Sequence, residues 1–365
     1  MVDVAQLQSI GKTAKAFAEQ ALEKTSKPNE IAPDLACVQL PIVNLFFFGE
    51  RNAKDLSWTM VDAGLPFFED RILRAAEERY GSGSRPSAII LTHGHFDHVG
   101  ALSFLAKRWD APIYAHTLEF PYLTGKASYP PPDPAVGGGA MSFMSRFFPR
   151  GPIDVSNRLH PLPQDGTVPG MPGWRWIHTP GHTPGHVSLF RVTDGALIAG
   201  DAFVTTKQES AFDALFMHRQ RVRRPPAYYT PNWELARRSV VALAELRPVI
   251  AATGHGVPMR GNELREELDA LVRDWDRIAV PAHGRYIHEP AKTDDHGVLS
   301  LPPAVYDPQL IKVAAIGVAA LAGWLLLRRR SAAKAKIAAK NMVSLAGGDT
   351  AVNVEGLPRY KVRCG

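Results

Sequence analysis

The sequence predicts a mixed α/β domain over residues 30–290, because strand-like and helix-like stretches alternate throughout that range. Short apolar runs rich in β-branched and aromatic residues indicate the strands, whereas apolar residues spaced by three or four positions indicate the helices. Several of the strand-like runs also end in a histidine or an aspartate beside glycine. The same pattern therefore predicts both the fold class and the place of the chemistry.

The expected elements begin in residues 1–29, where apolar residues recur at helical spacing among lysines and a glutamate. This spacing predicts an amphipathic helix that docks on the body of the protein or on a membrane surface. The strand-like runs that follow are 35–49, 58–62, 87–92, 112–115, 174–178, 186–192, 196–200 and 248–252. The helical patterns are 66–80, 98–109, 231–246 and 261–278.

Residues 118–158 interrupt this alternation. They contain three consecutive prolines (130–132), three consecutive glycines (137–139) and a group of methionines and phenylalanines. A loop that is both long and apolar is typical of a lid or a binding loop, and its aromatic content argues against a plain linker. We therefore expect a lid-like insertion in the catalytic domain.

The C-terminal part of the sequence differs in composition from the body. Residues 291–309 are rich in acidic residues and proline and are expected to form a linker. Residues 310–327 are apolar apart from one lysine, and as a helix they would extend about 27 Å, close to the hydrocarbon thickness of a bilayer. We expect a membrane helix there, followed by a basic tail over 328–365. The membrane is thus an expected partner through 310–327.

Charge and cysteine content exclude several classes of protein. The net charge is +6, but residues 310–365 carry +8 and the rest of the chain −2, so we expect no nucleic acid as a partner. The two cysteines, Cys37 and Cys364, do not form a disulfide framework and are typical of a reducing compartment. Since the N-terminus also has no apolar signal-peptide core, we expect the protein in the cytoplasm or on the cytoplasmic face of a membrane.

The strongest chemical signal is HGHFDH at 93–98, which directly follows the strand-like run 87–92. Neutral imidazoles and carboxylates are ligands of zinc and similar divalent ions. The four candidate ligands are His93, His95, Asp97 and His98. One ion with an open catalytic position cannot use all four, so the motif predicts two metal sites. His93 and His95 would face one ion, and Asp97 and His98 the other.

Three further strand-like runs end in the same way. The run 196–200 leads into Asp201, the run 248–252 leads into His255 between two glycines, and the run 174–178 leads into HTPGHTPGH at 178–186. Glycine lets the backbone approach an ion closely. If these strand ends meet at one edge of a sheet, they complete a dinuclear site.

The three histidines of HTPGHTPGH are spaced by four, as on one face of a helix. Two Pro-Gly pairs in nine residues forbid a helix, so the three histidines cannot be equivalent. The strand context, together with the family resemblance described next, favours His182 as the ligand. His178 ends one strand, and His186 begins the next and acts at most indirectly, behind the ligands.

These motifs together resemble the metallo-β-lactamase superfamily, and within it the glyoxalase II-like and lactonase-like hydrolases. The resemblance rests on TxHxHxDH, TPGHTPGH, the Gly-Asp pair at 200–201, the Gly-His-Gly triplet at 254–256 and VDAG at 61–64. It implies an αββα sandwich, to which this chain would add the apolar C-terminal helix.

The resemblance also implies a role for each residue. His93, His95 and His182 would bind the first metal, and Asp97, His98 and His255 the second. Asp201 would bridge the two ions together with a water or hydroxide, and Asp62 would orient the ligands from behind. The cofactor is expected to be two divalent ions, zinc first, with iron or manganese as alternatives.

The predicted activity is hydrolysis of a small acyl substrate. Two divalent ions generate a hydroxide at neutral pH, which would attack a thioester, a lactone or a related carboxylic ester. Asp97 would help to orient this nucleophile. Tyr228 and Tyr229 are candidates for substrate contacts, although a tyrosine is more often a packing residue.

Three alternatives use the same residues. The first is a mononuclear iron dioxygenase of the persulfide type, whose ligand set overlaps this one. The second is a membrane-tethered binding module without catalysis, against which the intact set of seven ligand positions argues. The third is a nuclease that uses the basic run 218–224, which the weakly acidic body disfavours.

Overall fold

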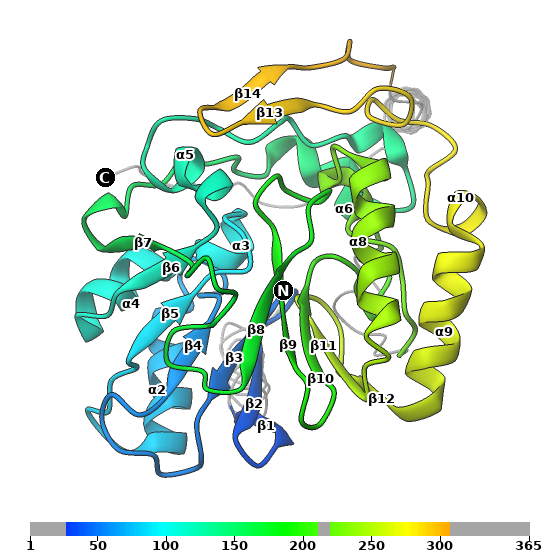
Figure 1. Cartoon of the computed structure of the whole chain (residues 1–365). Helices are drawn as coiled ribbons and strands as arrows, with labels where there is room; N and C mark the ends of the chain where they lie inside the picture. The colour runs from blue at the N-terminus through cyan, green and yellow to red at the C-terminus, as the bar shows by residue number, and fades with distance from the viewer. Residues whose placement is uncertain (1–26, 211–219, 307–365) are drawn as a thin grey trace, which may run out of the picture. The chain divides into compact units, whose positions relative to one another are not determined.

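Figure 1 presents a computed structural model of the chain, which describes residues 27–210 and 220–306. The expected amphipathic helix lies almost entirely outside these ranges, as do the apolar helix predicted over 310–327 and the basic tail over 328–365. Within the described ranges, no helix is both long enough and apolar enough to cross a bilayer.

Two mixed β-sheets form the centre of the fold. The first sheet has seven strands in chain order: β1 (Asn29–Ala32), β2 (Leu35–Gln39), β3 (Asn44–Phe48), β4 (Thr59–Val61), β5 (Ala88–Ile90), β6 (Ile113–Ala115) and β7 (Leu159–Pro161). The second has five strands in the order β12 (Met259–Arg260), β11 (Ile250–Thr253), β10 (Ala196–Gly200), β9 (Val187–Arg191) and β8 (Trp174–His178). Strands β4 to β7 are parallel to one another, as are β10 and β11.

Alternating side chains of the strands pack in two different layers. In β3, Phe46 and Phe48 belong to the core between the two sheets, together with Leu189 and Ile198 of the second sheet. Leu45 and Phe47, which alternate with them along the strand, belong to a separate core on the outer face of the first sheet. Successive residues of a strand point to opposite faces, so an apolar run without alternation is buried on both sides.

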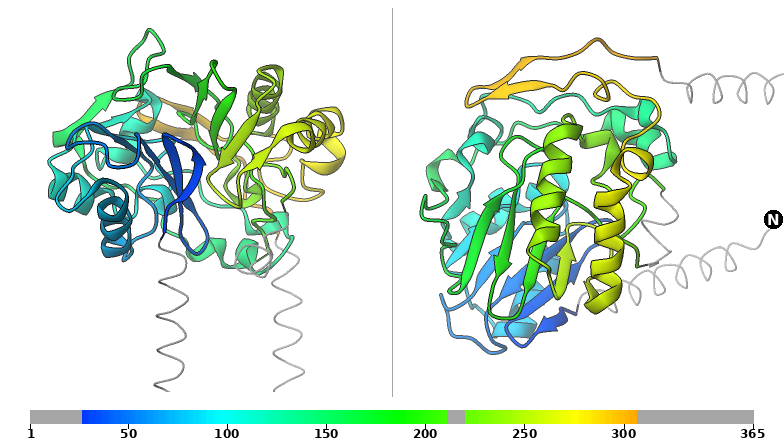
Figure 2. Two further views of the ribbon diagram at one scale, coloured as in Figure 1. Left: turned by 90° about the horizontal axis from the view of Figure 1, so that it is seen from below. Right: turned by 45° about the vertical axis from the view of Figure 1, so that its right-hand side comes forward.

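Helices cover the two outer faces (Figure 2). On the first sheet lie α2 (Glu69–Tyr80) and α4 (Leu102–Trp109), and on the second lie α8 (Trp233–Glu245), α9 (Gly261–Arg273) and α10 (Trp275–Ile278). Apolar residues at helical spacing form the buried face of each, such as Ile72, Ala75 and Ala76 in α2. This arrangement confirms the predicted αββα sandwich.

The structure refines several predicted elements. The run 35–49 is two antiparallel strands, β2 and β3, and the helical pattern 98–109 is α3 (Phe96–Val99) followed by α4. The predicted linker 291–309 contains a hairpin of β13 (Lys292–Asp294) and β14 (Gly297–Ser300). These strands are only three and four residues long, and β13 is charged at both ends, so neither has the apolar alternation by which a strand is recognised in a sequence.

The expected insertion 118–158 is built mostly of short helical turns. They are η1 (Thr117–Glu119), α5 (Phe120–Leu123), η2 (Pro134–Val136), α6 (Ala140–Met144), η3 (Ser145–Phe147) and η4 (Ser156–Arg158). A further turn, η5 (Ala227–Tyr229), lies outside the insertion. The insertion has buried side chains of its own, including Tyr122 and Tyr129. Parts of it are therefore packed into the body, and the role of a lid stays a prediction.

Candidate metal centre

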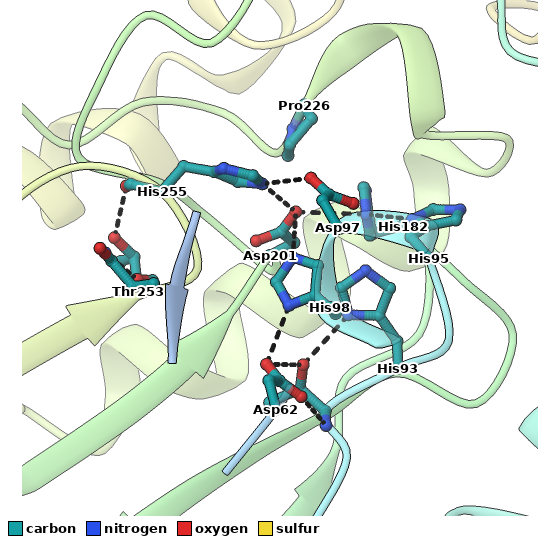
Figure 3. A network of polar contacts seen from close by, with 12 residues as sticks. Asp62, His93, His95, Asp97, His98, His182, Asp201, Pro226, Thr253 and His255 are labelled. Carbon is teal, nitrogen blue, oxygen red and sulfur yellow. Dashed lines mark hydrogen bonds and ion pairs between the residues drawn. The ribbon is translucent and has the colours of Figure 1, made fainter. Parts of the chain in front are cut away.

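The predicted ligands meet where the strands end (Figure 3). The loop after β5 and the short helix α3 carry His93, His95, Asp97 and His98. The loop between β8 and β9 carries His182, and β10 and β11 lead into Asp201 and His255. All seven side chains are buried.

Two groups of three among these side chains have no member in common and have ligand atoms within 4.8 Å of one another, and a third group, His93, His98 and Asp201, overlaps both. We call His93, His95 and His182 site 1, and Asp97, His98 and His255 site 2. Asp201 lies between them, with its Oδ2 atom 3.4 Å from His182 Nε2 in site 1 and 3.0 Å from His255 Nε2 in site 2. The geometry thus brings together all seven residues that the sequence predicted.

Three of the five candidate histidines have a hydrogen-bond partner behind one ring nitrogen, which directs the other nitrogen toward the centre. His98 Nδ1 lies 2.9 Å from Asp62 Oδ2, His93 Nδ1 lies 3.1 Å from Thr92 Oγ1, and His255 Nδ1 contacts the carbonyl oxygen of Ile42. In each case the opposite nitrogen, Nε2, remains for the centre. This is the usual way in which a protein orients imidazole ligands of a metal.

The residues present fit divalent metal ions. Within the described part of the chain, His93 Nε2, His98 Nε2 and Asp201 Oδ1 are buried and have no hydrogen-bond partner. Burying polar atoms in this state is costly unless something else satisfies them. In site 1, His95 Nδ1 and His182 Nε2 face each other at 2.9 Å. Imidazole nitrogens and carboxylate oxygens are the donors that zinc accepts.

Electrostatics favour the ligating forms of the site 1 histidines and of Asp201, whereas the groups of site 2 shift the other way. Burial lowers the pKa of His95 to about 3 and holds the pKa of His93 and His182 well below their usual range, so these imidazoles are neutral at pH 7. For Asp201, burial alone would raise the pKa, but His255 and His98 outweigh it and hold the pKa well below its usual range. In site 2, burial raises the pKa of Asp97, and for His98 and His255 burial lowers the pKa but Asp201 outweighs it, so that the pKa of each is raised.

Asp62 and His186 lie behind the candidate ligands, at the positions that the sequence analysis expected for them. Asp62 accepts hydrogen bonds from the backbone N–H of Thr92 at 2.8 Å and from its hydroxyl at 2.7 Å, besides its contact with His98. His186 Nε2 accepts the backbone N–H of Asp201 at 2.9 Å. His178 is instead exposed and stacks on His116, with ring centroids 4.2 Å apart. The three histidines of HTPGHTPGH therefore have three different environments.

Glu119 is a supporting residue that the sequence motifs did not reveal. Its carboxylate is fully buried and accepts hydrogen bonds from Gly94, Thr183 and Gly185 in the two loops of site 1, and from the hydroxyl of Tyr129. Burial raises the pKa of Glu119, while these four donors oppose the increase. The available signal was its place shortly after β6, another strand of the same sheet.

A narrow pocket opens beside site 1 and is lined by His95 and His182. The remaining lining residues are aromatic rings and prolines: Tyr129, Tyr228, Tyr229, Tyr286, Pro130, Pro131, Pro184 and Pro231. The ring of Tyr229 stacks on that of His95, with centroids 4.3 Å apart, and its hydroxyl lies 3.4 Å from the carbonyl oxygen of Pro149. Both tyrosines predicted to contact substrate thus line the pocket.

Comparisons with known proteins agree with this geometry. The family model of the metallo-beta-lactamase superfamily matches residues 51–255, a range that contains all seven candidate ligands. The chain belongs to this superfamily.

Two relatives in the superfamily come from Bacillus subtilis (strain 168). The chain is 44 % identical over 249 residues to the probable metallo-hydrolase YflN, covering 68 % of this chain and 94 % of that protein. It is 30 % identical over 204 residues to the probable metallo-hydrolase YybB, covering 56 % and 78 %. Among solved structures, it is similar to a beta-lactamase domain protein from Burkholderia ambifaria at 22 % identity and a TM-score of 0.49, covering 69 % and 77 %.

Proposed function

We propose that this protein is a metal-dependent hydrolase that uses two divalent ions to cleave an uncharged carboxylic ester, either a lactone or a thioester. The observation that carries the proposal is the convergence of buried donor atoms into site 1 and site 2, joined by Asp201. The name metallo-hydrolase, which both Bacillus relatives bear, supports the reaction class.

Divalent ions held by these residues would supply Lewis acidity and a hydroxide at neutral pH. The chain's own residues hold the reacting groups in place. Asp201 presents an ionised carboxylate to both sites. Asp97 lies beside His255, with its Oδ2 atom 3.6 Å from Nε2, where it would orient the attacking water. The buried setting strengthens each of these electrostatic interactions.

The pocket beside site 1 supports the choice of an uncharged substrate. Apart from the two histidine ligands, its lining residues are tyrosines and prolines, with no lysine, arginine or carboxylate among the described lining residues. The hydroxyl of Tyr286 donates to the carbonyl oxygen of Pro131 at 2.7 Å, so the ring rather than the polar group is offered to a ligand. Aromatic rings and prolines favour a compact apolar acyl group.

The test combines metal analysis with a substrate panel. Protein loaded with zinc should contain two equivalents and hydrolyse uncharged lactones or simple acyl thioesters faster than an S-acyl thioester of glutathione, which carries two carboxylates. The variant Asp201→Asn should lose this activity, whereas Asp295→Asn, at an exposed carboxylate in the β13–β14 hairpin, should keep it. Two bound zinc ions without hydrolysis of any ester in the panel would refute the proposal.

The same measurements separate the alternatives. One equivalent of iron, together with oxygen consumption on glutathione persulfide, would favour the dioxygenase. Cellular function that survives Asp201→Asn would favour a non-catalytic binding module. Membrane association through 310–327 is a separate proposal, which cosedimentation of the full chain with anionic lipid vesicles would test.

A further inference from the structure

Glu119 is a buried carboxylate whose partners are all neutral. It ends η1, is 0 % exposed, and accepts four hydrogen bonds. Its Oε2 atom accepts from the backbone N–H of Gly94 at 3.0 Å and from the hydroxyl of Tyr129. Its Oε1 atom accepts from the backbone N–H of Gly185 at 2.7 Å and from the hydroxyl of Thr183 at 2.8 Å. A carboxylate is costly to bury, so four donors around one are a specific arrangement.

The four donors come from two loops that both belong to site 1, and from Tyr129. Gly94 lies between the ligands His93 and His95, and Thr183 directly follows the ligand His182. The two loops come from different sheets, β5 leading into one and β8 into the other. Glu119 therefore joins the two halves of site 1 through the backbone N–H groups of Gly94 and Gly185 and the hydroxyl of Thr183, and none of its four hydrogen bonds involves a ligand side chain.

The Gly94 and Gly185 backbones are packed too closely against Glu119 and Tyr129 to admit a side chain. A Cβ atom on Gly94 would lie 2.5 Å from the Tyr129 hydroxyl, and one on Gly185 would lie 2.7 Å from Glu119 Cγ. Each loop thus approaches the Glu119–Tyr129 pair as closely as glycine permits. This is an observation separate from the hydrogen bonds, and it indicates that the spacing of the loops is set here.

A metal site needs such spacing. Two nitrogens bound to one tetrahedral zinc ion at about 2.0–2.1 Å lie about 3.3 Å apart, and His95 Nδ1 and His182 Nε2 are 2.9 Å apart. Errors of a few tenths of an ångström in ligand distance weaken a metal site. Tyr129 adds to the support, because its hydroxyl also accepts the Gly94 N–H at 2.9 Å and its ring packs on His95.

We propose that Glu119 and Tyr129 are positioning residues for site 1, which fix the distance between the two loops that carry its histidines and thereby set its metal affinity. The inference rests on the metal centre of the proposed function. It does not depend on which ester is cleaved, since metal affinity can be measured without a substrate.

The test measures zinc affinity at one site at a time. In full-length protein, His255→Ala impairs site 2 and leaves site 1, and His182→Ala does the reverse. In each background, Tyr129→Phe removes the hydroxyl that Glu119 and Gly94 share. A matched control is Tyr122→Phe, because Tyr122 stacks on Tyr129 at 3.9 Å and its buried hydroxyl has no hydrogen-bond partner among the described residues.

Competition with a chromogenic chelator gives the dissociation constant for zinc. We expect Tyr129→Phe to weaken site 1 by about 10- to 100-fold, the range found when support of a metal ligand is removed, and to change site 2 by less than about threefold. Glu119→Gln should weaken site 1 at least as much, because an amide cannot accept from donors on both of its ends. Tyr122→Phe should alter neither site.

Two results would overturn the proposal. One is an unchanged site 1 in Tyr129→Phe, and the other is an equal loss at both sites, which would indicate a general effect on stability. If Glu119→Gln does not fold, the zinc affinity of site 1 in Tyr129→Phe, compared with that in Tyr122→Phe, still tests the proposal. The visible absorption of Co²⁺ bound in site 1 should also change in Tyr129→Phe and not in Tyr122→Phe. Failure of ester hydrolysis in the unchanged protein would refute the proposed function and leave these binding constants as they are.

Discussion

Replacing Gly254 with alanine should remove metal binding through steric contact alone. Gly254 follows β11 and precedes His255, and its φ angle is outside the left-handed region. A Cβ atom added here would lie 2.1 Å from Asp201 Oδ1 and 2.7 Å from His98 Cε1. Both neighbours are candidate ligands, so the substitution acts on the metal centre without straining the backbone.

The size of the effect follows from these distances. Real Cβ atoms essentially never approach another atom within 3.0 Å, so Asp201 Oδ1 must move by about 0.9 Å. Metal–ligand distances tolerate about 0.2 Å, several times less than this displacement. Loss of Asp201 affects both sites, because its other oxygen lies near His182 and His255. We therefore expect zinc affinity to fall by more than about 100-fold, beyond the effect of removing a supporting residue.

The assay is zinc stoichiometry after dialysis, combined with thermal denaturation of the metal-free protein. The control is Gly261→Ala, where a Cβ atom meets nothing within 4 Å but φ is +66°. That variant should lose about 1–2 kcal/mol of stability through backbone strain and still bind two zinc ions. If Gly254→Ala binds two zinc ions with unchanged affinity, or if Gly261→Ala loses them as well, the steric reasoning is wrong.

Three further predictions concern the surroundings of the site. Asp62→Asn removes the carboxylate behind His98. In the His182→Ala background it should weaken zinc binding by about 10- to 100-fold, measured by chelator competition. An unchanged dissociation constant for zinc would contradict this role of Asp62. Zinc at 100 times its dissociation constant should stabilise the metal-free protein by about 2.7 kcal/mol for each site that it fills, raising Tm by about 5 °C per site in calorimetry, whereas Mg²⁺ at the same concentration should not. Burial and His178 lower the pKa of His116 to about 4 from 6.5, so the unfolded chain binds a proton that the folded protein resists, and stability should fall as the pH decreases from 6.5 to 4. Urea denaturation at pH 7 and pH 4.5 measures how much free energy of unfolding is lost on acidification. In His116→Asn this loss should be smaller by about 1–2 kcal/mol, a value that allows for the partial exposure of His116. Equal losses in both proteins would contradict the role given to His116.

The candidate ligands could be predicted because each stands at the end of a strand. A short apolar run is recognisable in a sequence, and the residues after it are placed at the sheet edge with little freedom. This is why HGHFDH, His182, Asp201 and His255 meet in one centre as expected. The Pro-Gly pairs in HTPGHTPGH similarly exclude a helix on the strength of residue type alone, because proline and glycine act on the local backbone.

The supporting contacts could not be predicted in this way. Glu119 is 25 positions from Gly94 and 66 from Gly185, and only the packing of two sheets brings the three together. Asn44 is another example, since its side chain donates to the carbonyl oxygen of Thr253 at 2.8 Å across 209 positions and steadies the loop before His255. Contacts at such separations leave no periodicity in the sequence.

By itself, then, the sequence determined the kind of chemistry, the order of the main elements and the family resemblance, because these depend on residue type and near neighbours. The tertiary structure decided which nitrogen of His93, His98 and His255 faces the centre, that His186 accepts the backbone N–H of Asp201, and that Glu119 and Tyr129 contact the loops of site 1. The physical reason is that orientation depends on hydrogen bonds between segments that are distant in the chain, and these exist only once the two sheets have packed.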